Sequence, residues 1–268
     1  MVIELKYSGT NTYLIRGTDD SILFDTGWAG SFPQFGRALG EAGATVQEIR
    51  YLFISHFHPD HMGIAQEIAD CGVKIVVADV QRAHIHDADV VFAKEGNRFY
   101  QPVVDKNVRV ISSGESRALL EECGIAGEVV HTPGHSEDSI SLCLDDGMFF
   151  VGDLNPLYEL ELHRGTQIGE SWDKLLAKNP VRVYYGHAKA TEPGGKQRMT
   201  KKESGHSEDT FRLVKKIVKC LDKGYTLEDI GRSLSADILF VEDVARMYLT
   251  HQNISVQGIL DRIEIKGK

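Results

Sequence analysis

The 268-residue chain contains few cysteines, and none of them form a C-x-x-C pair. The four lie far apart, at Cys71, Cys123, Cys143 and Cys220. This spacing predicts reduced, mostly buried thiols rather than a disulfide framework. No apolar run approaches the roughly 20 residues that a membrane-spanning helix needs, and the opening MVIELKYSG lacks the charged-then-apolar pattern of a secretion signal. We therefore expect a cytoplasmic protein with no membrane partner.

The chain also lacks an excess of basic residues, because its formal net charge is -9. Binding to a nucleic-acid backbone needs clustered Lys and Arg, so we do not expect nucleic acid as the main partner. The hydrophobic content of 42% and the charged content of 26% are ordinary for a globular protein that buries a full core. These values favour a soluble enzyme acting on a small-molecule substrate.

One short segment is rich in histidine although the chain has only 11. SHFHPDHMG, residues 55–63, holds His56, His58 and His61, with Asp60 between the last two. The preceding IRYLFIS predicts a buried strand, in which residues i and i+2 point to the same side. Pro59 suits the first turn of a helix, and the apolar positions of DHMGIAQEIADCG follow helical spacing. The four side chains should converge where strand meets helix, and they suit zinc, iron or manganese.

Three further candidate ligands each follow an apolar run. They are His135 in GEVVHTPGHS, Asp153 in MFFVGDLN and His187 in VRVYYGHA. All three segments have the order strand, glycine, ligand. Glycine lets the backbone turn sharply at a strand end and permits close approach to a bound group. We expect these residues to complete the metal centre.

Together these motifs resemble the metallo-β-lactamase superfamily of metallohydrolases over about residues 1 to 190. The family's H-x-H-x-D-H motif, later histidine, Gly-Asp and final Gly-His correspond to His56, His58, Asp60, His61, His135, Asp153 and His187. TNTYLI and SILFDTG are similar to the family's first hairpin, whose aspartate, here Asp25, supports the site from outside the ligand set. Within the superfamily, the motifs are most similar to those of glyoxalase II and the lactonases.

The resemblance implies two divalent metal ions, with zinc preferred and iron or manganese as alternatives. One ion would be held by His56, His58 and His135. The second would be held by Asp60, His61 and His187, with Asp153 bridging the two. True metallo-β-lactamases generally lack an aspartate at the bridging position, so Asp153 argues against an antibiotic-degrading role.

Such a centre predicts a metal-dependent hydrolase. Two ions lower the pKa of a shared water, and the resulting hydroxide can attack a carbonyl carbon or a phosphorus. We expect cleavage of an ester, thioester or lactone bond, with phosphodiester hydrolysis as the alternative. The resemblance implies that Asp60 orients the nucleophile and takes up its proton. Tyr158 and His163 are the candidates for the general acid.

Two other classes stay open. A sulfur dioxygenase-like oxidoreductase with a single iron would use the same scaffold, although the arginine motif of those enzymes does not follow Asp153. A binding protein with a degenerate site would usually lose a ligand, and this chain keeps all of them. His84 and His86 in AHIHDAD form another H-x-H pair. We predict a helix there, in which residues i and i+2 diverge, so a second metal site is not expected.

The order of predicted elements indicates an α+β fold. Besides IRYLFIS, strands are expected near residues 2–6, 11–16, 21–25, 73–77, 126–130, 139–144, 147–151 and 181–184, and helices near 33–42, 79–93 and 115–123. Two sheets packed face to face with helices outside account for this order. The resemblance implies that residues 1–200 form a four-layer αββα sandwich, the metallo-β-lactamase catalytic domain.

After about residue 205 the strand patterns stop. DTFRLVKKIVKCLDKG has apolar residues at helical spacing, and TLEDIGRSL opens with a capping pattern at Thr226. FVEDVARMYLTHQ and VQGILDRI add two short helices. We therefore expect a helical C-terminal extension over residues 201–268, which would form a homodimer interface or cover the substrate.

Overall fold

The computed structural model describes residues 1–193 and 208–238, followed by residues 240, 241, 244, 245, 248, 256 and 258–260. The larger of two sheets contains, in spatial order, β1 (Val2–Leu5), β2 (Thr12–Arg16), β3 (Ser21–Phe24), β4 (Ile49–Phe53), β5 (Lys74–Ala78) and β6 (Val108–Ile111). Strands β1 to β3 form an antiparallel meander, and β3 to β6 run parallel.

The smaller sheet has the order β10-β9-β8-β7. Its strands are β7 (Gly127–His131), β8 (Ile140–Leu144), β9 (Met148–Phe150) and β10 (Arg182–Tyr184). Only β9 and β10 are parallel. Because β10 and β9 run the same way, the chain leaves both strands at the same edge of the sheet.

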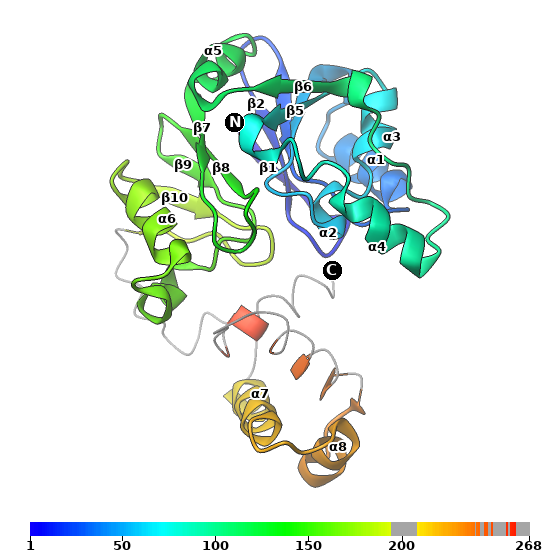
Figure 1. The fold of residues 1–268 in the computed structure, drawn as a ribbon, viewed down its shortest axis with the longest axis vertical. Coiled ribbons are helices and arrows are strands. Elements are labelled where there is room, and N and C mark those ends of the chain that lie inside the picture. Colours follow the sequence, from blue (N-terminus) through cyan, green and yellow to red (C-terminus); the bar gives the residue numbers. More distant parts are fainter. Residues whose placement is uncertain are drawn as a thin grey trace.

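The helices of the sandwich are α1 (Phe32–Glu41), α2 (Pro59–Met62), α3 (Ala65–Asp70), α4 (Asp87–Glu95), α5 (Ser116–Glu121) and α6 (Gln167–Leu176). Helix α5 packs Leu119 and Leu120 into the apolar cluster between the two sheets rather than onto an outer face. Short 3-10 helices lie at Val46–Glu48, Asp79–Gln81, Asp105–Asn107, Ser113–Glu115 and Leu157–His163. In Figure 1, α1, α3 and α4 lie beside the larger sheet and α6 lies beside the smaller one.

Alternation along the strands buries both faces of the larger sheet. Leu14 of β2 joins Phe35 of α1 in a core cluster on the helix side. Its neighbour Ile15 belongs to the cluster between the two sheets, which includes Phe150. A third cluster packs Trp172 of α6 against the smaller sheet. The three apolar layers between four structural layers confirm the predicted αββα sandwich.

The helix predicted over residues 79–93 is shorter than expected. Residues 79–81 form a 3-10 turn, residues 82–86 form further turns, and α4 begins only at Asp87. The buried side chain of Gln81 accepts a hydrogen bond from the Ala78 amide and donates one to the Ile54 carbonyl, at 3.2 and 2.9 Å. These contacts tie the turn to the chain that follows β4, so tertiary structure overrides the helical spacing.

Two elements were missed by the sequence patterns. Strand β6 pairs with β5 at the edge of the larger sheet, where two of its four residues are exposed and the apolar alternation is weak. Helix α6 begins after Thr166, whose hydroxyl accepts a hydrogen bond from the Gly169 amide at 3.4 Å. It buries Trp172 and Leu175 three residues apart, a helical spacing that could have revealed it.

The C-terminal segment begins with α7 (Glu208–Leu221) and α8 (Leu227–Leu234). As the capping pattern predicts, the Thr226 hydroxyl accepts a hydrogen bond from the Asp229 amide at 3.2 Å. The segment has a core cluster whose buried members all follow residue 213: Val214, Ile217, Ile230, Val241, Val244, Ile259 and Leu260. Much of FVEDVARMYLTHQ and VQGILDRI lies outside the described residues, as does the predicted boundary near residue 200. The division into two domains therefore stays a prediction.

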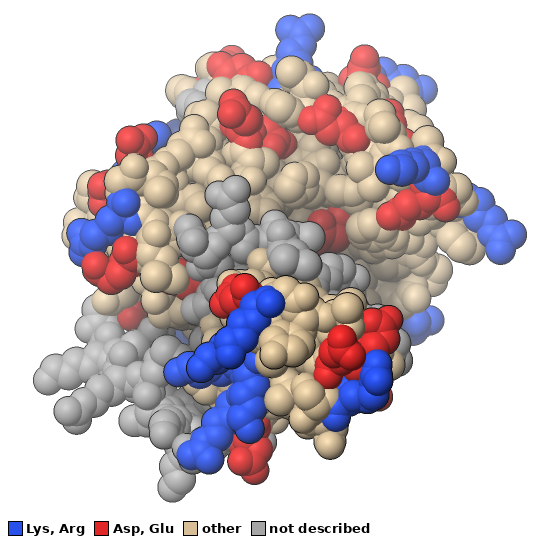
Figure 2. All heavy atoms as spheres, turned by 60° about the horizontal axis from the view of Figure 1, so that its bottom comes forward, with Lys and Arg blue, Asp and Glu red and all other residues tan. Residues whose placement is uncertain are grey.

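The surface of the C-terminal segment carries a local concentration of basic side chains (Figure 2). Four basic residues of α7 are exposed: Arg212, Lys215, Lys216 and Lys219. Within the described part of the chain, no helix combines the length and apolar character that a membrane crossing requires. All four cysteines are free thiols, and Cys123 and Cys143 are buried.

Candidate metal centre

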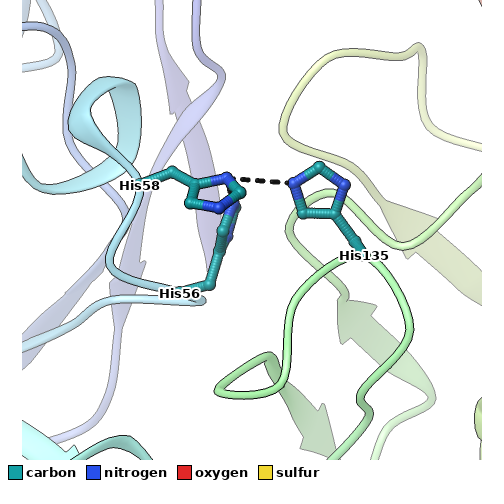
Figure 3. Close-up of side chains that lie close together, drawn as sticks. All are labelled: His56, His58 and His135. Atoms are coloured by element: carbon teal, nitrogen blue, oxygen red, sulfur yellow. Dashed lines mark hydrogen bonds between the residues drawn. The ribbon is translucent and has the colours of Figure 1, made fainter. Parts of the chain in front are cut away.

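The predicted ligands meet at one edge of the sandwich, where strands of both sheets end. His56 and His58 follow β4, and His61 projects from the four-residue α2. The remaining ligands come from the smaller sheet: His135 lies between β7 and β8, Asp153 follows β9 and His187 follows β10. Figure 3 shows His135 facing His56 and His58 from the opposite side.

The first group of side chains consists of three histidines. His56 Nε2 lies 2.9 Å from His58 Nδ1, and His135 Nε2 lies 3.1 Å from the same His58 atom. Three imidazole nitrogens at these distances can share one ion, because each can offer a lone pair to a point between them. The group matches the first metal set expected from the sequence.

The second group combines a carboxylate and two histidines. His187 Nε2 lies 2.9 Å from Asp60 Oδ2 and 3.2 Å from His61 Nε2. Asp60 Oδ2 is 3.7 Å from His61 Nε2. One oxygen and two nitrogens therefore converge within a few ångströms of one another, as expected for the second metal set.

Asp153 lies between the two groups. Its Oδ1 is 3.3 Å from His61 Nε2 and 3.5 Å from His187 Nε2, whereas its Oδ2 is 3.5 Å from His135 Nε2. The carboxylate is buried, and among the described residues Oδ1 has no hydrogen-bond partner. A buried oxygen without a partner is costly unless a cation satisfies it. Donor chemistry and geometry therefore fit two divalent ions bridged by Asp153.

The charges at the centre shift the pKa values of its ligands. Burial, assisted by His61, holds the pKa of His56 well below its usual value, so this imidazole is neutral as a metal ligand must be. Burial raises the pKa of Asp153, but His187 and His61 outweigh burial and lower it, which keeps the group ionised. Burial lowers the pKa of His61, but Asp153 and Asp25 outweigh it and raise that pKa. The position of His61 therefore attracts positive charge.

Asp25 occupies the supporting position that the sequence suggested. Its Oδ2 lies 2.9 Å from His61 Nδ1, so the ring directs Nε2 towards the centre. The same carboxylate accepts hydrogen bonds from the Ser55 amide and hydroxyl at 2.6 and 2.8 Å. Ser55 Oγ also lies 3.0 Å from His56 Nδ1. Asp25 adopts a φ of 61°, a left-handed conformation that aspartate tolerates better than most residues.

The glycines beside the ligands are required by close packing. A Cβ on Gly152 would lie 2.4 Å from Ser55 Oγ, and the residue has a φ of 55°. A Cβ on Gly186 would lie 2.6 Å from Asp153 Oδ1 and 2.7 Å from His61 Cε1. At Gly152 and Gly186 the order strand, glycine, ligand therefore reflects close packing around the centre, whereas a Cβ on Gly134, before His135, would lie 2.6 Å from Ile168 Cγ1.

Two supporting residues received no role from the sequence patterns. Asp138 accepts a hydrogen bond from the Phe57 amide at 2.7 Å, which joins the His135 loop to the loop between His56 and His58. Asn11 donates from its side-chain amide to the carbonyls of the His187 loop. Asp138 lies three residues after His135, and Asn11 lies within TNTYLI. Proximity to these motifs was the only sign in the sequence that the two residues support the centre. Neither pattern indicates which distant loop the side chain reaches.

The candidate general acids lie in the 3-10 helix Leu157–His163. Tyr158 is half-buried, and His163 is buried with its pKa lowered by burial. A small, open pocket adjoins the centre and is lined by Gly152, Asp153, Leu154, Pro156, Tyr185, His187 and Ala188. Tyr158 and His163 are not among these residues, so their role as general acids stays a prediction.

The second H-x-H pair does not lie in a helix. His84 and His86 occupy the turns before α4. His84 Nδ1 lies 2.7 Å from an Asp87 oxygen, and His86 Nδ1 lies 3.0 Å from an Asp89 oxygen. The groups of ligand atoms that converge in the described residues do not include this pair.

Comparison with other proteins supports the same family. The model of the metallo-beta-lactamase superfamily matches residues 6–187. The Beta-lactamase-like protein 2 homolog of Drosophila melanogaster is 29% identical over 201 residues, which are 72% of this chain and 63% of that protein. The homolog of Caenorhabditis elegans is 26% identical over 239 residues, covering 85% of this chain and 72% of its own. The chain thus spans less than two thirds of the length of the fly relative.

A third relative has an enzymatic name. The Atrochrysone carboxyl ACP thioesterase of Aspergillus terreus is 25% identical over 155 residues, covering 56% of this chain and 40% of its own.

Solved structures show the same fold. A metallo-beta-lactamase family protein of Thermus thermophilus has a TM-score of 0.54 at 18% identity and covers 100% of this chain and 93% of its own. A protein crystallised in a di-iron-bound form has a TM-score of 0.54 at 22% identity and covers 72% of this chain and 94% of its own. The family match extends over most of the sandwich and all seven converging ligands, and the chain therefore belongs to the metallo-beta-lactamase superfamily.

Proposed function

We propose that this metallohydrolase cleaves a thioester, or a related ester or lactone, at a centre of two divalent ions with zinc as the preferred metal. The observation that carries the proposal is the position of Asp153, with one carboxylate oxygen facing each group of ligands. That arrangement serves a pair of ions, whereas a single-iron oxygenase would not need it. Iron and manganese remain the alternatives that metal analysis must decide between.

Two divalent ions bound at this centre would lower the pKa of a water molecule and polarise the oxygen of the scissile carbonyl. The protein's own groups prepare the place for this chemistry. Asp25 orients His61, and Asp153 keeps the two groups of ligands together. The Asp60 side chain is 37% exposed, so a proton that its carboxylate took from the nucleophile could pass to solvent. Burial raises the pKa of this carboxylate, but His61 and His187 outweigh burial and lower it.

A thioester fits the surroundings of the centre better than an ester of an alcohol. A thiol has a pKa of about 8.5, so a thiolate leaves without the strong proton donor that an alkoxide requires. Among the residues that line the pocket, Tyr185 could serve as a proton donor, but its hydroxyl lies 2.7 Å from Thr191 Oγ1 and is engaged there. The other titratable lining residues, Asp153 and His187, are candidate metal ligands. The names of the Aspergillus terreus, Aspergillus fumigatus and Emericella nidulans relatives, all ACP thioesterases, support the same substrate class.

The test compares the hydrolysis of a thioester, a lactone and an activated phosphodiester by one metal-loaded preparation. Asp153→Ala removes the bridging carboxylate, and Asp145→Ala removes an exposed carboxylate paired with Arg117 as the matched control. We expect a preference for the thioester that Asp153→Ala abolishes and Asp145→Ala preserves. A preference for the phosphodiester would replace the proposed substrate class. Oxygen consumption with bound iron and no hydrolysis would contradict the proposal.

Three further expectations stay predictions. They are a small-molecule substrate rather than nucleic acid, a cytoplasmic location, and a homodimer formed through the C-terminal helices. Sedimentation of the full chain beside a chain ending before α7 would test the role of these helices in assembly.

A further inference from the structure

The hairpin between β1 and β2 reaches the half of the metal centre that contains Asp60 and His187. Its turn residues lie far from both ligands in the sequence. Thr10 Oγ1 donates a hydrogen bond to the Asp60 carbonyl at 2.7 Å, across 50 positions. The Gly9 carbonyl lies 2.9 Å from His187 Nδ1, across 178 positions. The hairpin thus contacts both loops that supply the second group of ligands.

Asn11 makes the most extensive of these contacts. Its side-chain amide donates to the carbonyls of Tyr185 and Ala188 at 2.9 and 3.1 Å, and its backbone amide donates to the Gly186 carbonyl at 2.8 Å. Three N–H groups of one residue therefore hold the loop from Tyr185 to Ala188, which carries His187. The side chain is 7% exposed, so water does not readily replace these bonds.

The first group of ligands is supported by different residues. Ser55 Oγ lies beside His56 Nδ1, and Asp138 holds the Phe57 amide next to His58. Asp138 Oδ1 also accepts a hydrogen bond from Ser136, the neighbour of His135. Each half of the centre therefore has one outer support of its own, the hairpin for the second group and the loop of residues 136–138 for the first. Ser55 and Asp25 form a shared support, because they join His56 to His61.

We propose that Asn11 is a positioning residue that sets the affinity of the Asp60, His61 and His187 site for its metal ion, separately from the site of His56, His58 and His135. This inference rests on the two-metal centre of the proposed function. In Asn11→Ala the backbone amide still donates to the Gly186 carbonyl, but the carbonyls of Tyr185 and Ala188 lose their donors, so the loop that carries His187 is held less firmly. Outer partners of metal ligands typically change metal affinity about 10–100-fold. The second ion should therefore be lost first.

The experiment uses the full chain with Asn11→Ala and, as the reciprocal variant, Asp138→Ala. Metal content is measured by mass spectrometry against buffered free zinc, and occupied positions are located by anomalous diffraction from zinc-soaked crystals. We expect Asn11→Ala to bind the second ion about 10–100-fold more weakly, leaving the anomalous peak at the three histidines. We expect Asp138→Ala to retain the peak at Asp60, His61 and His187.

Thr10→Val provides a milder second variant, because valine keeps the shape of threonine and removes only the hydrogen bond to Asp60. It should lower the affinity of the same site by a smaller factor. A general loss of stability would weaken both sites together, so equal weakening of the two sites in Asn11→Ala would overturn the inference. Unchanged affinity at both sites would also overturn it. Neither readout uses hydrolysis, so an inactive wild-type protein that binds two ions would contradict only the proposed function.

Discussion

The two ends of β4 are both rich in ionisable side chains, but they are arranged in opposite ways. At the start of the strand, the Tyr51 hydroxyl lies 2.5 Å from Glu122, and Arg109 donates to that hydroxyl at 2.9 Å. Arg50 pairs with Asp20 and Glu122 at 3.1 and 3.0 Å. Each charge at this end has a partner of opposite sign in the protein.

At the other end of β4, imidazole nitrogens and carboxylate oxygens converge on a common space. His56 Nε2 and His58 Nδ1 lie 2.9 Å apart, and among the described residues Asp153 Oδ1 has no hydrogen-bond partner. A buried polar atom without a partner, surrounded by groups that can bind metal, marks a place arranged for a ligand. The difference indicates that the start of β4 has a structural role and that its end holds the candidate metal centre.

Among the changes that distinguish the two ends of β4, metal removal should have the largest effect on activity and stability. Chelation should abolish hydrolysis and lower the free energy of unfolding, because ions bind only the folded centre. The loss is about 2.7 kcal/mol for each ion whose free concentration had exceeded its dissociation constant 100-fold. Scanning calorimetry with and without zinc measures it. Identical melting temperatures for the wild type in both conditions would contradict a centre that is completed by metal.

Asp25→Asn should weaken metal binding about 10–100-fold, the range expected for an outer partner of a ligand. Asparagine tolerates the φ of 61° but can no longer present two oxygens to Ser55 and His61. Competition with a chromophoric chelator measures the affinity. Asp20→Asn, at the start of β3, is the matched control and should bind metal as the wild type does.

Gly186→Ala should destabilise the protein by about 1–3 kcal/mol, the usual effect of forcing an extra carbon into a packed site. The added Cβ would overlap Asp153 Oδ1 at 2.6 Å. The control is Gly36→Ala in α1, where nothing lies within 4 Å of the added carbon. Because alanine favours helices, that change should stabilise the protein by about 1 kcal/mol. Urea unfolding of the two variants should therefore give shifts of opposite sign.

Glu122→Gln, at the structural end, should have the smallest effect, less than about 1 kcal/mol, because solvent screens exposed ion pairs. The hydrogen bond from Tyr51, followed by the contacts with Arg109, lowers the pKa of the exposed Glu122 below its usual value. Its contribution to stability is therefore present above the unfolded pKa of 4.5 and is lost as pH falls through the folded pKa. Unfolding curves from pH 6 down to pH 3, recorded for both proteins, should converge at the acid end. If the stability of Glu122→Gln depended on pH in this range as strongly as that of the wild type, Glu122 would not be the source of that dependence.

The order of the predicted elements and the resemblance to the metallo-β-lactamase superfamily predicted the sandwich, which the structure confirms. The candidate ligands converge as expected, and their role in metal binding stays a prediction. Strand alternation and the turn at Pro59 placed His56, His58 and His61 together before any tertiary contact was considered. The patterns failed where a distant residue decides the local conformation. Gln81 replaces a predicted helical start with a turn because its side chain reaches the Ile54 carbonyl, 27 positions away.

The types of candidate ligand, their order and the glycines beside them can be predicted from the sequence, since each is a property of a few adjacent residues. The ring nitrogen that faces the centre, Nδ1 of His58 but Nε2 of His135, is set by the packing of the two sheets. That packing also brings Asn11 to the His187 loop, 177 positions from Ala188. Such choices are made only when the two sheets pack, because the atoms concerned belong to segments that have no reason to meet before then.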